Sequence, residues 1–165
     1  MICPSCSNHL DLLVIIKIQF YACEKGCGGL WFNRMAIKKL PELPDNSGQG
    51  LLMTGSADGV RSFRDVEHIC PQCKTTLLFR HFFSKAHDLE VDQCSKCGGL
   101  WVDFGRKNIF RKYSGSGEKF YLEKWRRFER VLKDKFDSME GMHPDLLESR
   151  EQMIHIFRFI SPSES

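Results

Sequence analysis

The sequence predicts a small metal-bound α+β protein: two units of short antiparallel β hairpins with four-cysteine knuckles and short helices, plus a C-terminal α-helical segment. Three observations support this fold class. All eight cysteines fall into two sets of four, and each set consists of two close pairs. A stretch rich in apolar and β-branched residues, which favour strands, separates the pairs in both sets. The residues after each closing pair are also alike, so the chain contains an internal repeat.

The repeat becomes visible when the two cysteine sets are overlaid. Each copy reads Cys-Pro-x-Cys, an apolar hairpin, a second cysteine pair, Gly-Gly-Leu-Trp, a capping residue and a short helix. Sixteen residues separate the pairs in the first copy and twenty in the second, and Gly26 is an extra residue in the first closing pair. The predicted metal ligands are Cys3, Cys6, Cys23, Cys27, Cys70, Cys73, Cys94 and Cys97.

These features divide the chain into four segments. They are a first unit at 1–40, a linker at 41–67, a second unit at 68–112 and a helical tail at 113–165. The linker is rich in Pro, Gly, Asn and Ser, which form loops. Gly50 and Gly55 have the separation of a phosphate-binding loop, but the lysine that such a loop needs is missing. We therefore expect a flexible connector.

In the first unit, the apolar residues 10–20 predict strand structure. If they form one strand, the residues on one face are Leu12, Val14, Ile16, Ile18 and Phe20. After the closing pair, Asn33 is expected to cap a short helix that carries Met35, Ile37 and Leu40.

In the second unit, Leu77 and Phe79 lead into one strand. Residues 89–92 alternate between apolar and acidic side chains and predict the returning strand. Asp103 is expected to cap a short helix that carries Ile109 and Phe110.

The tail is expected to form two amphipathic helices. Residues 118–138 place apolar side chains three and four apart, and Gly141 is the expected stop. The second helix is expected to begin near Pro144, since proline is favoured in a first turn. Its apolar stripe comprises Leu146, Leu147, Met153, Ile154, Phe157 and Ile160. The two helices are expected to pair and to pack against a unit or against another subunit.

Four thiolates in two close pairs suit a tetrahedral site for a soft cation. Zinc is the default ion, while iron uses the same ligands and stays open. Because the four thiolates fill the coordination shell, no position is left for a catalytic water. A redox dithiol is the rival interpretation, but a single Cys-x-x-Cys at a helix start is typical of that chemistry. We therefore expect a non-enzymatic protein with two Zn²⁺ sites, one per unit.

Cysteine usage also indicates the compartment. No export signal is expected, because the first cysteine set begins at Cys3. The longest apolar run, Leu12–Ile16, is too short to span a bilayer. Unpaired thiols fit a reducing compartment, so we expect a cytoplasmic protein with no membrane contact. Each site of four thiolates and one Zn²⁺ carries −2, which changes the formal charge of +3 to about −1. Nucleic-acid binding would therefore depend on local patches.

The cysteine pattern resembles the transcription-factor-IIB-type zinc-ribbon family of small bacterial proteins. The second copy matches that pattern at Cys70, Cys73, Cys94, Cys97, Gly98, Gly99, Trp101 and Asp103. The first copy, with its inserted residue, matches at Cys3, Cys6, Cys23, Cys27, Gly28, Gly29 and Trp31. The family usually continues with Asp-x-Gly-Glu; here Arg106 replaces the Glu, and Asn33 replaces the Asp of the first copy. The resemblance implies zinc binding, and suggests transcription by analogy only.

The segment 106–135 is the basic part of the chain. It holds eleven basic and four acidic residues, a net charge of +7. Either it is a solvated helix face with its aromatic residues in the core, or it contacts phosphates while Tyr113, Trp125 and Phe128 stack on bases. The candidate nucleic-acid contacts are Arg106, Lys107, Arg111, Lys112, Lys124, Arg126, Arg127 and Arg130.

Three functional hypotheses follow. The first is a protein-interaction or regulatory adaptor that binds an unidentified protein or self-associates through the tail. The second is a nucleic-acid-binding protein that uses the basic segment. The third is a thiol-redox or metal-handling protein. The six histidines show no catalytic pairing; only His68 lies beside a cysteine set, and we expect it on the surface or next to the ligands.

Overall fold

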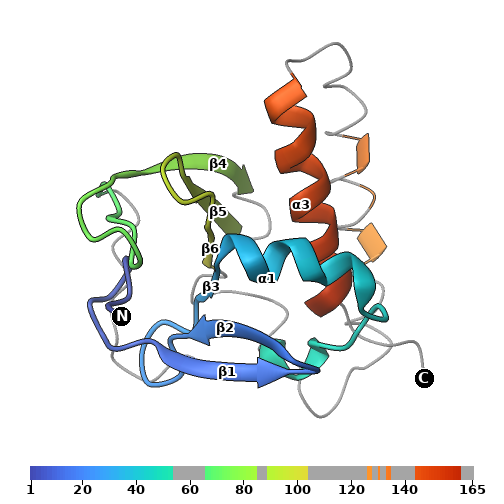
Figure 1. The fold of residues 1–165 in the computed structure, drawn as a ribbon, viewed down its shortest axis with the longest axis horizontal. Coiled ribbons are helices and arrows are strands. Elements are labelled where there is room, and N and C mark those ends of the chain that lie inside the picture. Colours follow the sequence, from blue (N-terminus) through green and yellow to red (C-terminus); the bar gives the residue numbers. More distant parts are fainter. Residues whose placement is uncertain are drawn as a thin grey trace.

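The computed structural model describes residues 1–53, 66–84, 89–103 and 144–160, and five helical residues, Arg126, Arg127, Arg130, Lys133 and Asp134. The predicted α+β fold, with two hairpin ribbons and a C-terminal helix, is confirmed (Figure 1). We refer to residues 1–40 as ribbon 1 and to residues 68–103 as ribbon 2. Within the described ranges, no helix combines the length and the apolar character that a membrane span requires.

Six strands form one antiparallel sheet in the order β1-β2-β3-β6-β5-β4. The strands of ribbon 1 are β1 (Asp11–Ile15), β2 (Ile18–Ala22) and β3 (Leu30–Phe32). The strands of ribbon 2 are β4 (Leu78–Ser84), β5 (Leu89–Cys94) and β6 (Leu100–Asp103). The two ribbons are therefore halves of one sheet.

The ribbons meet where β3 pairs with β6, and this junction is symmetric. Trp31 lies opposite Trp101. On either side of this pair, Leu30 lies opposite Val102, and Phe32 lies opposite Leu100. The two equivalent tryptophans therefore pair with each other, and a local two-fold axis exchanges the Leu30–Val102 pair with the Phe32–Leu100 pair. The cysteine spacing predicts each ribbon but carries no information about this junction.

The first hairpin differs from the expectation of one strand over residues 10–20. The chain reverses at Ile16 and Lys17, whose φ angles are 45° and 67°. Positive φ at both central residues is typical of two-residue hairpin turns. These turns usually have Asn or Gly at the central positions, so Ile and Lys did not predict one here. Because of the reversal, Ile18 and Phe20 are buried, whereas Leu12, Val14 and Ile16 are exposed. The predicted shared face is therefore wrong.

One face of the sheet carries the main hydrophobic core. Helices α1 (Arg34–Lys39) and α3 (Pro144–Ile160) cover this face, and α1 contacts β2, β3 and α3 (Figure 1). The Phe159 ring lies 6.0 Å from that of Phe20 and 6.3 Å from that of Phe32, both edge-on. Burying each such ring contributes about 1.5–3 kcal/mol. The predicted helix start at Pro144 is confirmed. The buried α3 side chains are Met153, Ile156, Phe157, Phe159 and Ile160.

The beginning of the predicted linker also belongs to this core. Two 3-10 helices, η1 (Leu40–Glu42) and η2 (Gln49–Met53), follow α1, and Leu51 is buried with α3. The Gly48 amide donates to the Phe159 carbonyl at 2.7 Å. A Cβ at position 48 would lie 2.7 Å from the Phe159 ring carbon Cζ, so glycine lets the chain approach the ring. This part of the 41–67 segment packs as core and is not a free connector.

Candidate metal centres

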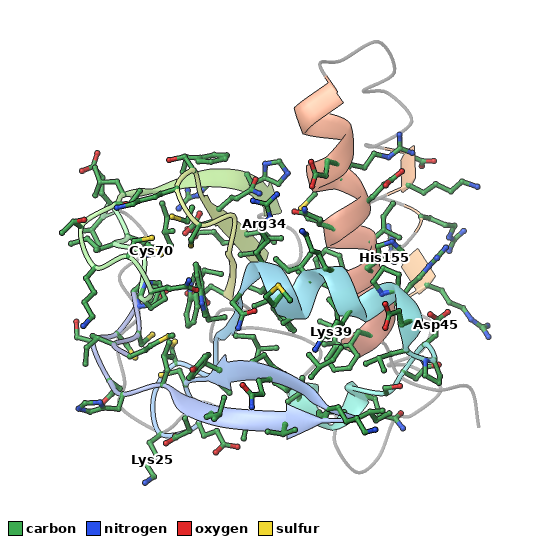
Figure 2. The ribbon with its side chains drawn as sticks, viewed as in Figure 1. Lys25, Arg34, Lys39, Asp45, Cys70 and His155 are labelled. Carbon is green, nitrogen blue, oxygen red and sulfur yellow. The ribbon has the colours of Figure 1, made fainter. Side chains whose placement is uncertain are left out.

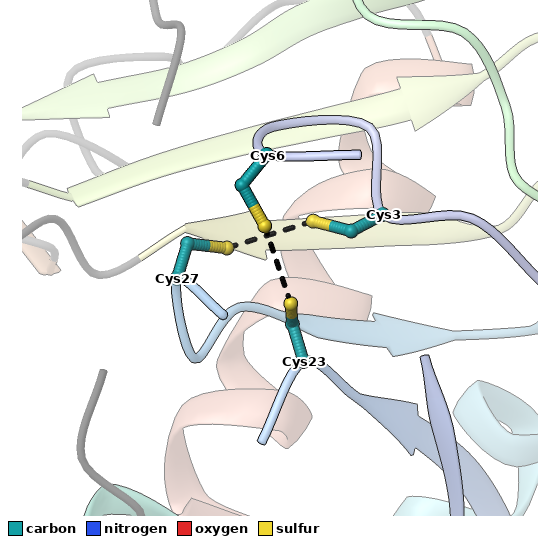
Figure 3. A group of neighbouring side chains, drawn as sticks. All are labelled: Cys3, Cys6, Cys23 and Cys27. Atoms are coloured by element: carbon teal, nitrogen blue, oxygen red, sulfur yellow. Dashed lines mark hydrogen bonds between the residues drawn. The ribbon is translucent and has the colours of Figure 1, made fainter. Parts of the chain in front are cut away.

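The four cysteines of ribbon 1 point their sulfur atoms at one point (Figure 3). The Sγ atoms of Cys3 and Cys27 are 3.5 Å apart, and those of Cys6 and Cys23 are 3.4 Å apart. Three of the four side chains are buried, and Cys6 is partly exposed. The opening pair comes from the N-terminal turn and the closing pair from the turn between β2 and β3.

Ribbon 2 repeats this arrangement with the predicted second set. The Sγ atoms of Cys70 and Cys97 are 3.7 Å apart, and those of Cys73 and Cys94 are 3.9 Å apart. Cys70 and Cys94 are buried, while Cys73 and Cys97 are partly exposed. In both ribbons, the four sulfur atoms lie within 4.8 Å of one another.

The donor sets fit zinc. With a Zn–S distance of about 2.3 Å, the sulfurs of a tetrahedral site are about 3.8 Å apart, close to the observed separations. Contact with Cys23 raises the pKa of the Cys27 thiol far above its usual value, whereas hydrogen bonds from Cys27 and Cys3 lower the pKa of Cys23 to about 2. Four thiolates at this distance need a cation between them, so each ribbon holds one zinc site.

The backbone turns that place the sulfurs share one hydrogen bond in both ribbons. Gly28 and Gly98 have φ angles of 76° and 72°, as expected for the first glycine after each closing pair. Each donates its amide to the carbonyl of the first closing cysteine at 2.9 Å. In ribbon 2, the Cys73 amide also donates to the Cys70 sulfur at 3.3 Å, which favours the thiolate form.

The extra residue of ribbon 1, Gly26, lies inside its closing turn. A Cβ at this position would collide with the Cys23 sulfur, and it would lie 2.7 Å from the Cys6 sulfur. The insertion is therefore tolerated because it is glycine, and the site keeps its four ligands.

The second glycine of each Gly-Gly-Leu-Trp motif has a different task. A Cβ on Gly29 would collide with the indole ring of Trp101, and a Cβ on Gly99 would collide with that of Trp31. Each ribbon thus places its tryptophan over a glycine of the other. Both indoles are fully buried beside the cysteines. The Gly-Gly-Leu-Trp motif therefore shapes the turn at the cysteines and also forms the contact between the two ribbons.

Side chains that follow each tryptophan reach the opposite knuckle. Arg34, labelled in Figure 2, is the first residue of α1. It packs against Gly98, since a Cβ there would lie 3.4 Å from the Arg34 Cδ. Asp103 lies near Cys27 and helps to raise the pKa of that thiol. The three lysines near the cysteines in sequence, Lys25, Lys74 and Lys96, are all exposed.

The two tryptophans differ in their hydrogen bonds. Trp101 Nε1 donates to the hydroxyl of buried Ser5 at 2.9 Å. Trp31 Nε1 is buried and has no hydrogen-bond partner in the described part of the chain. Gln72 stands in ribbon 2 where Ser5 stands in ribbon 1, and its side chain is exposed. The local symmetry is therefore broken at this pair.

A second group of ligand-type side chains lies beside the ribbon 2 site and was missed by the sequence analysis. It comprises His68, Glu90 and Asp92, which we call the His68 cluster; all three are buried. His68 Nδ1 lies 2.7 Å from Asp92 Oδ2, so the histidine is not on the surface. Burial, and then the charge of Asp92, raise the pKa of Glu90 to about 7, although Arg80 opposes this shift. The available signals were the alternating pattern over residues 89–92 and the position of His68 two residues before Cys70.

The structure describes three of the eight basic residues proposed for nucleic-acid contact. Arg126, Arg127 and Arg130 are helical, within the predicted helix at 118–138, and exposed. The other five lie outside the described residues: Arg106, Lys107, Arg111, Lys112 and Lys124.

Comparison with known proteins agrees with the geometry of the two cysteine sites. A family model described as transcription factor zinc-finger, of the TFIIB zinc-ribbon type, matches residues 2–42 and 69–106. The two matched segments correspond to the two ribbons and contain all eight cysteines. No curated protein and no solved structure matches the chain significantly.

Proposed function

Because both ribbons match the model of the transcription-factor-IIB-type zinc-ribbon family, we propose that the chain is a non-enzymatic adaptor that binds a protein partner. Both four-cysteine sites have closed shells, which supports a structural role for zinc. The eight cysteines are free of disulfides, which supports a reducing location such as the cytoplasm. The zinc sites would then hold a rigid surface in place.

The observation that carries the proposal is an exposed apolar patch formed by Leu12, Val14 and Ile16, which we call the outer patch. These side chains are 50%, 58% and 58% exposed, respectively. They lie on β1 and its turn, and β1 is an edge strand of the described sheet. Unpaired backbone groups with alternate apolar side chains suit the addition of an extended peptide strand. The apolar side chains at the C-terminal end of α3, such as Phe157 and Ile160, are by contrast buried within the chain.

Photo-crosslinking in cells that produce the protein would test this proposal. A photoreactive residue at Val14 is expected to yield discrete adducts, identified by mass spectrometry. The same residue at Met35, which is 63% exposed on α1, is the matched control and is expected to yield none. An adduct between two copies of the chain would identify self-association. Equal labelling from both positions, or none from Val14, would contradict the proposal.

Nucleic-acid binding is the second candidate, favoured by the exposed helical residues Arg126, Arg127 and Arg130. Zinc-loaded protein would be titrated with DNA and RNA at two salt concentrations. Phosphate contacts give an affinity that falls steeply with salt, and replacing the three arginines with glutamine should reduce that slope. Absence of binding at low salt would eliminate this candidate.

A further inference from the structure

Ribbon 2 contains a set of buried donor atoms that neither zinc site uses. We propose that the His68 cluster is a third metal site, which binds one divalent cation through the His68 imidazole and the carboxylates of Glu90 and Asp92. The donor set is one nitrogen and two carboxylates, which suits Zn²⁺ and harder ions such as Mn²⁺. This inference is independent of the adaptor proposal.

The donor atoms already lie at distances close to those of a shared cation. His68 Nδ1 is 2.7 Å from Asp92 Oδ2 and 3.8 Å from Glu90 Oε1, and all three donor atoms lie within 4.8 Å of one another. Ligand atoms bonded to one cation at about 2.0–2.2 Å are separated by about 3.3–3.6 Å in a tetrahedral site and about 2.8–3.1 Å in an octahedral site. Small side-chain rotations therefore suffice to enclose an ion, which would replace the hydrogen bond between His68 and Asp92.

Glu90 gives an independent reason to expect a ligand. Its side chain is fully buried, and its Oε2 atom has no hydrogen-bond partner among the described residues. Leaving a buried polar atom unsatisfied costs about 1–3 kcal/mol, and more when the group is charged. A cation bound by the carboxylate would satisfy it.

Ribbon 1 shows that the hairpin itself does not require these charges. Tyr21 and Asp92 occupy the same place, since each pairs with the tryptophan of its own ribbon. By the same register, Gln19 corresponds to Glu90, and Met1 to His68. Ribbon 1 folds into the same hairpin without a metal ligand at these three positions. The His68 cluster is therefore an addition to ribbon 2 that calls for a separate explanation.

Arg80 is the competing partner of the carboxylates. Its Nη2 lies 2.5 Å from Glu90 Oε1, and its Nε lies 3.8 Å from Asp92 Oδ1. The Arg80 side chain is 44% exposed, so it can turn outward when a cation binds. Removing Arg80 should therefore strengthen cation binding. If the cluster were only an ion-pair network, removing Arg80 would weaken the fold and create no site.

The proposed site has an approach from solvent. The cluster lines a pocket of about 440 Å³ together with Val66, Glu67, Leu78 and Arg80. Three protein ligands leave at least one coordination position open, as in zinc sites that bind water or a small ligand. The third site would thus be exchangeable, unlike the two closed four-cysteine sites.

Manganese provides a direct test in the full chain loaded with two Zn²⁺ per chain, which fill the four-cysteine sites and leave the third site free. Mn²⁺ prefers oxygen and nitrogen donors and does not compete for thiolates. Titration followed by electron paramagnetic resonance of free Mn²⁺ should show one Mn²⁺ bound per chain. The isosteric variants Glu90→Gln and Asp92→Asn should weaken binding about tenfold or more. Glu24→Gln, which removes an exposed carboxylate beside Cys23, is the control and should bind normally.

Two further measurements keep the test decisive. Zinc content of two per chain and an unchanged near-ultraviolet circular dichroism spectrum would show that the cluster variants are folded. Arg80→Gln should bind Mn²⁺ more tightly than the unaltered protein. If neither the unaltered protein nor Arg80→Gln binds Mn²⁺, or if Glu90→Gln and Asp92→Asn bind as well as Glu24→Gln, the proposal is overturned.

Discussion

Ribbon 1 and ribbon 2 share a hairpin, a four-cysteine knuckle and a Gly-Gly-Leu-Trp motif, yet they differ beside their metal sites. Ribbon 1 has the inserted Gly26, Ser5 within its opening pair, and uncharged residues at the positions that correspond to the His68 cluster. Ribbon 2 has Gln72 at the Ser5 position and three buried ligand-type side chains. The residues that the two ribbons share are those that the zinc site and the junction require. The positions at which the ribbons differ are not needed for either, so their side chains can serve another role.

The junction explains why the ribbons depend on each other. Trp31 and Trp101 each pack on a glycine of the opposite ribbon, and β3 pairs with β6. The core on the other face of the sheet contains Phe20 from ribbon 1, Val91 from ribbon 2 and Phe159 from α3. Neither ribbon has a complete core of its own, so we expect the protein to unfold as one unit.

The largest effect should follow from removing one zinc site. Cys94→Ser takes a ligand from ribbon 2, and a structural zinc contributes about 10–16 kcal/mol in peptide systems, as much as the whole stability of a typical domain. Because the ribbons share one sheet and one core, we expect ribbon 1 to lose its tertiary structure too. Near-ultraviolet circular dichroism and zinc content would measure this. Exhaustive chelation should have the same effect.

Amide hydrogen exchange would show whether the two ribbons separate in that variant. Full protection of the β1 and β2 amides in Cys94→Ser, with one zinc retained, would mean that ribbon 1 folds alone and that the junction contributes little. Cys23→Ser is the reciprocal variant and should behave in the same way, since the junction is symmetric.

A smaller effect should follow from changing the glycines of the junction. Gly29→Ala and Gly99→Ala each place a methyl group against the opposite tryptophan, and overpacking of this kind costs about 1–3 kcal/mol. The two variants should be similarly destabilised in urea unfolding. Gly50→Ala is the control, because a Cβ at that position meets no atom within 4 Å. Unequal losses of stability in the two variants would show that the junction is symmetric in its geometry but not in its energetics.

The predictable features depend on local chemistry. The eight cysteines, the helix start at Pro144 and the Asn33 cap can be predicted because each needs only near neighbours. The cap is confirmed: Asn33 Oδ1 accepts the Ala36 amide at 2.8 Å. Positive φ at Gly28 and Gly98 follows from the same local reasoning about a tight turn.

The features that could not be predicted depend on distant partners. The turn at Ile16 and Lys17 uses residues that usually avoid positive φ, so tertiary packing overrides their preference. The role of Gly29 depends on Trp101, far along the chain, and a single copy of the motif does not reveal it. His68, Glu90 and Asp92 come together only through the pairing of β5 with its neighbours, and their alternation alone would equally suit a solvent-facing strand.

Breaking the tryptophan hydrogen bond tests the asymmetry of the two ribbons. Ser5→Ala leaves Trp101 Nε1 buried without its acceptor, which lies at 2.9 Å in the structure. Loss of such a partner costs about 1–3 kcal/mol. Urea unfolding should show this loss, while zinc content stays at two per chain. A Ser5→Ala variant as stable as the unaltered protein would mean that the indole finds another acceptor or a water molecule.

The smallest predicted effect would restore the symmetry. Gln72→Ser places a hydroxyl in ribbon 2 at the position that Ser5 occupies in ribbon 1, where it can accept from the buried Trp31 Nε1. A new hydrogen bond contributes about 0.5–1.5 kcal/mol, so this variant should be more stable than the unaltered protein, although it loses a surface side chain. Gln72→Ala is the matched control, since it removes the same amide without supplying a hydroxyl. Equal stabilities of the serine and alanine variants in urea would mean that position 72 does not face Trp31 as Ser5 faces Trp101. The two-fold symmetry would then relate the strands of the two ribbons but not their opening cysteine pairs.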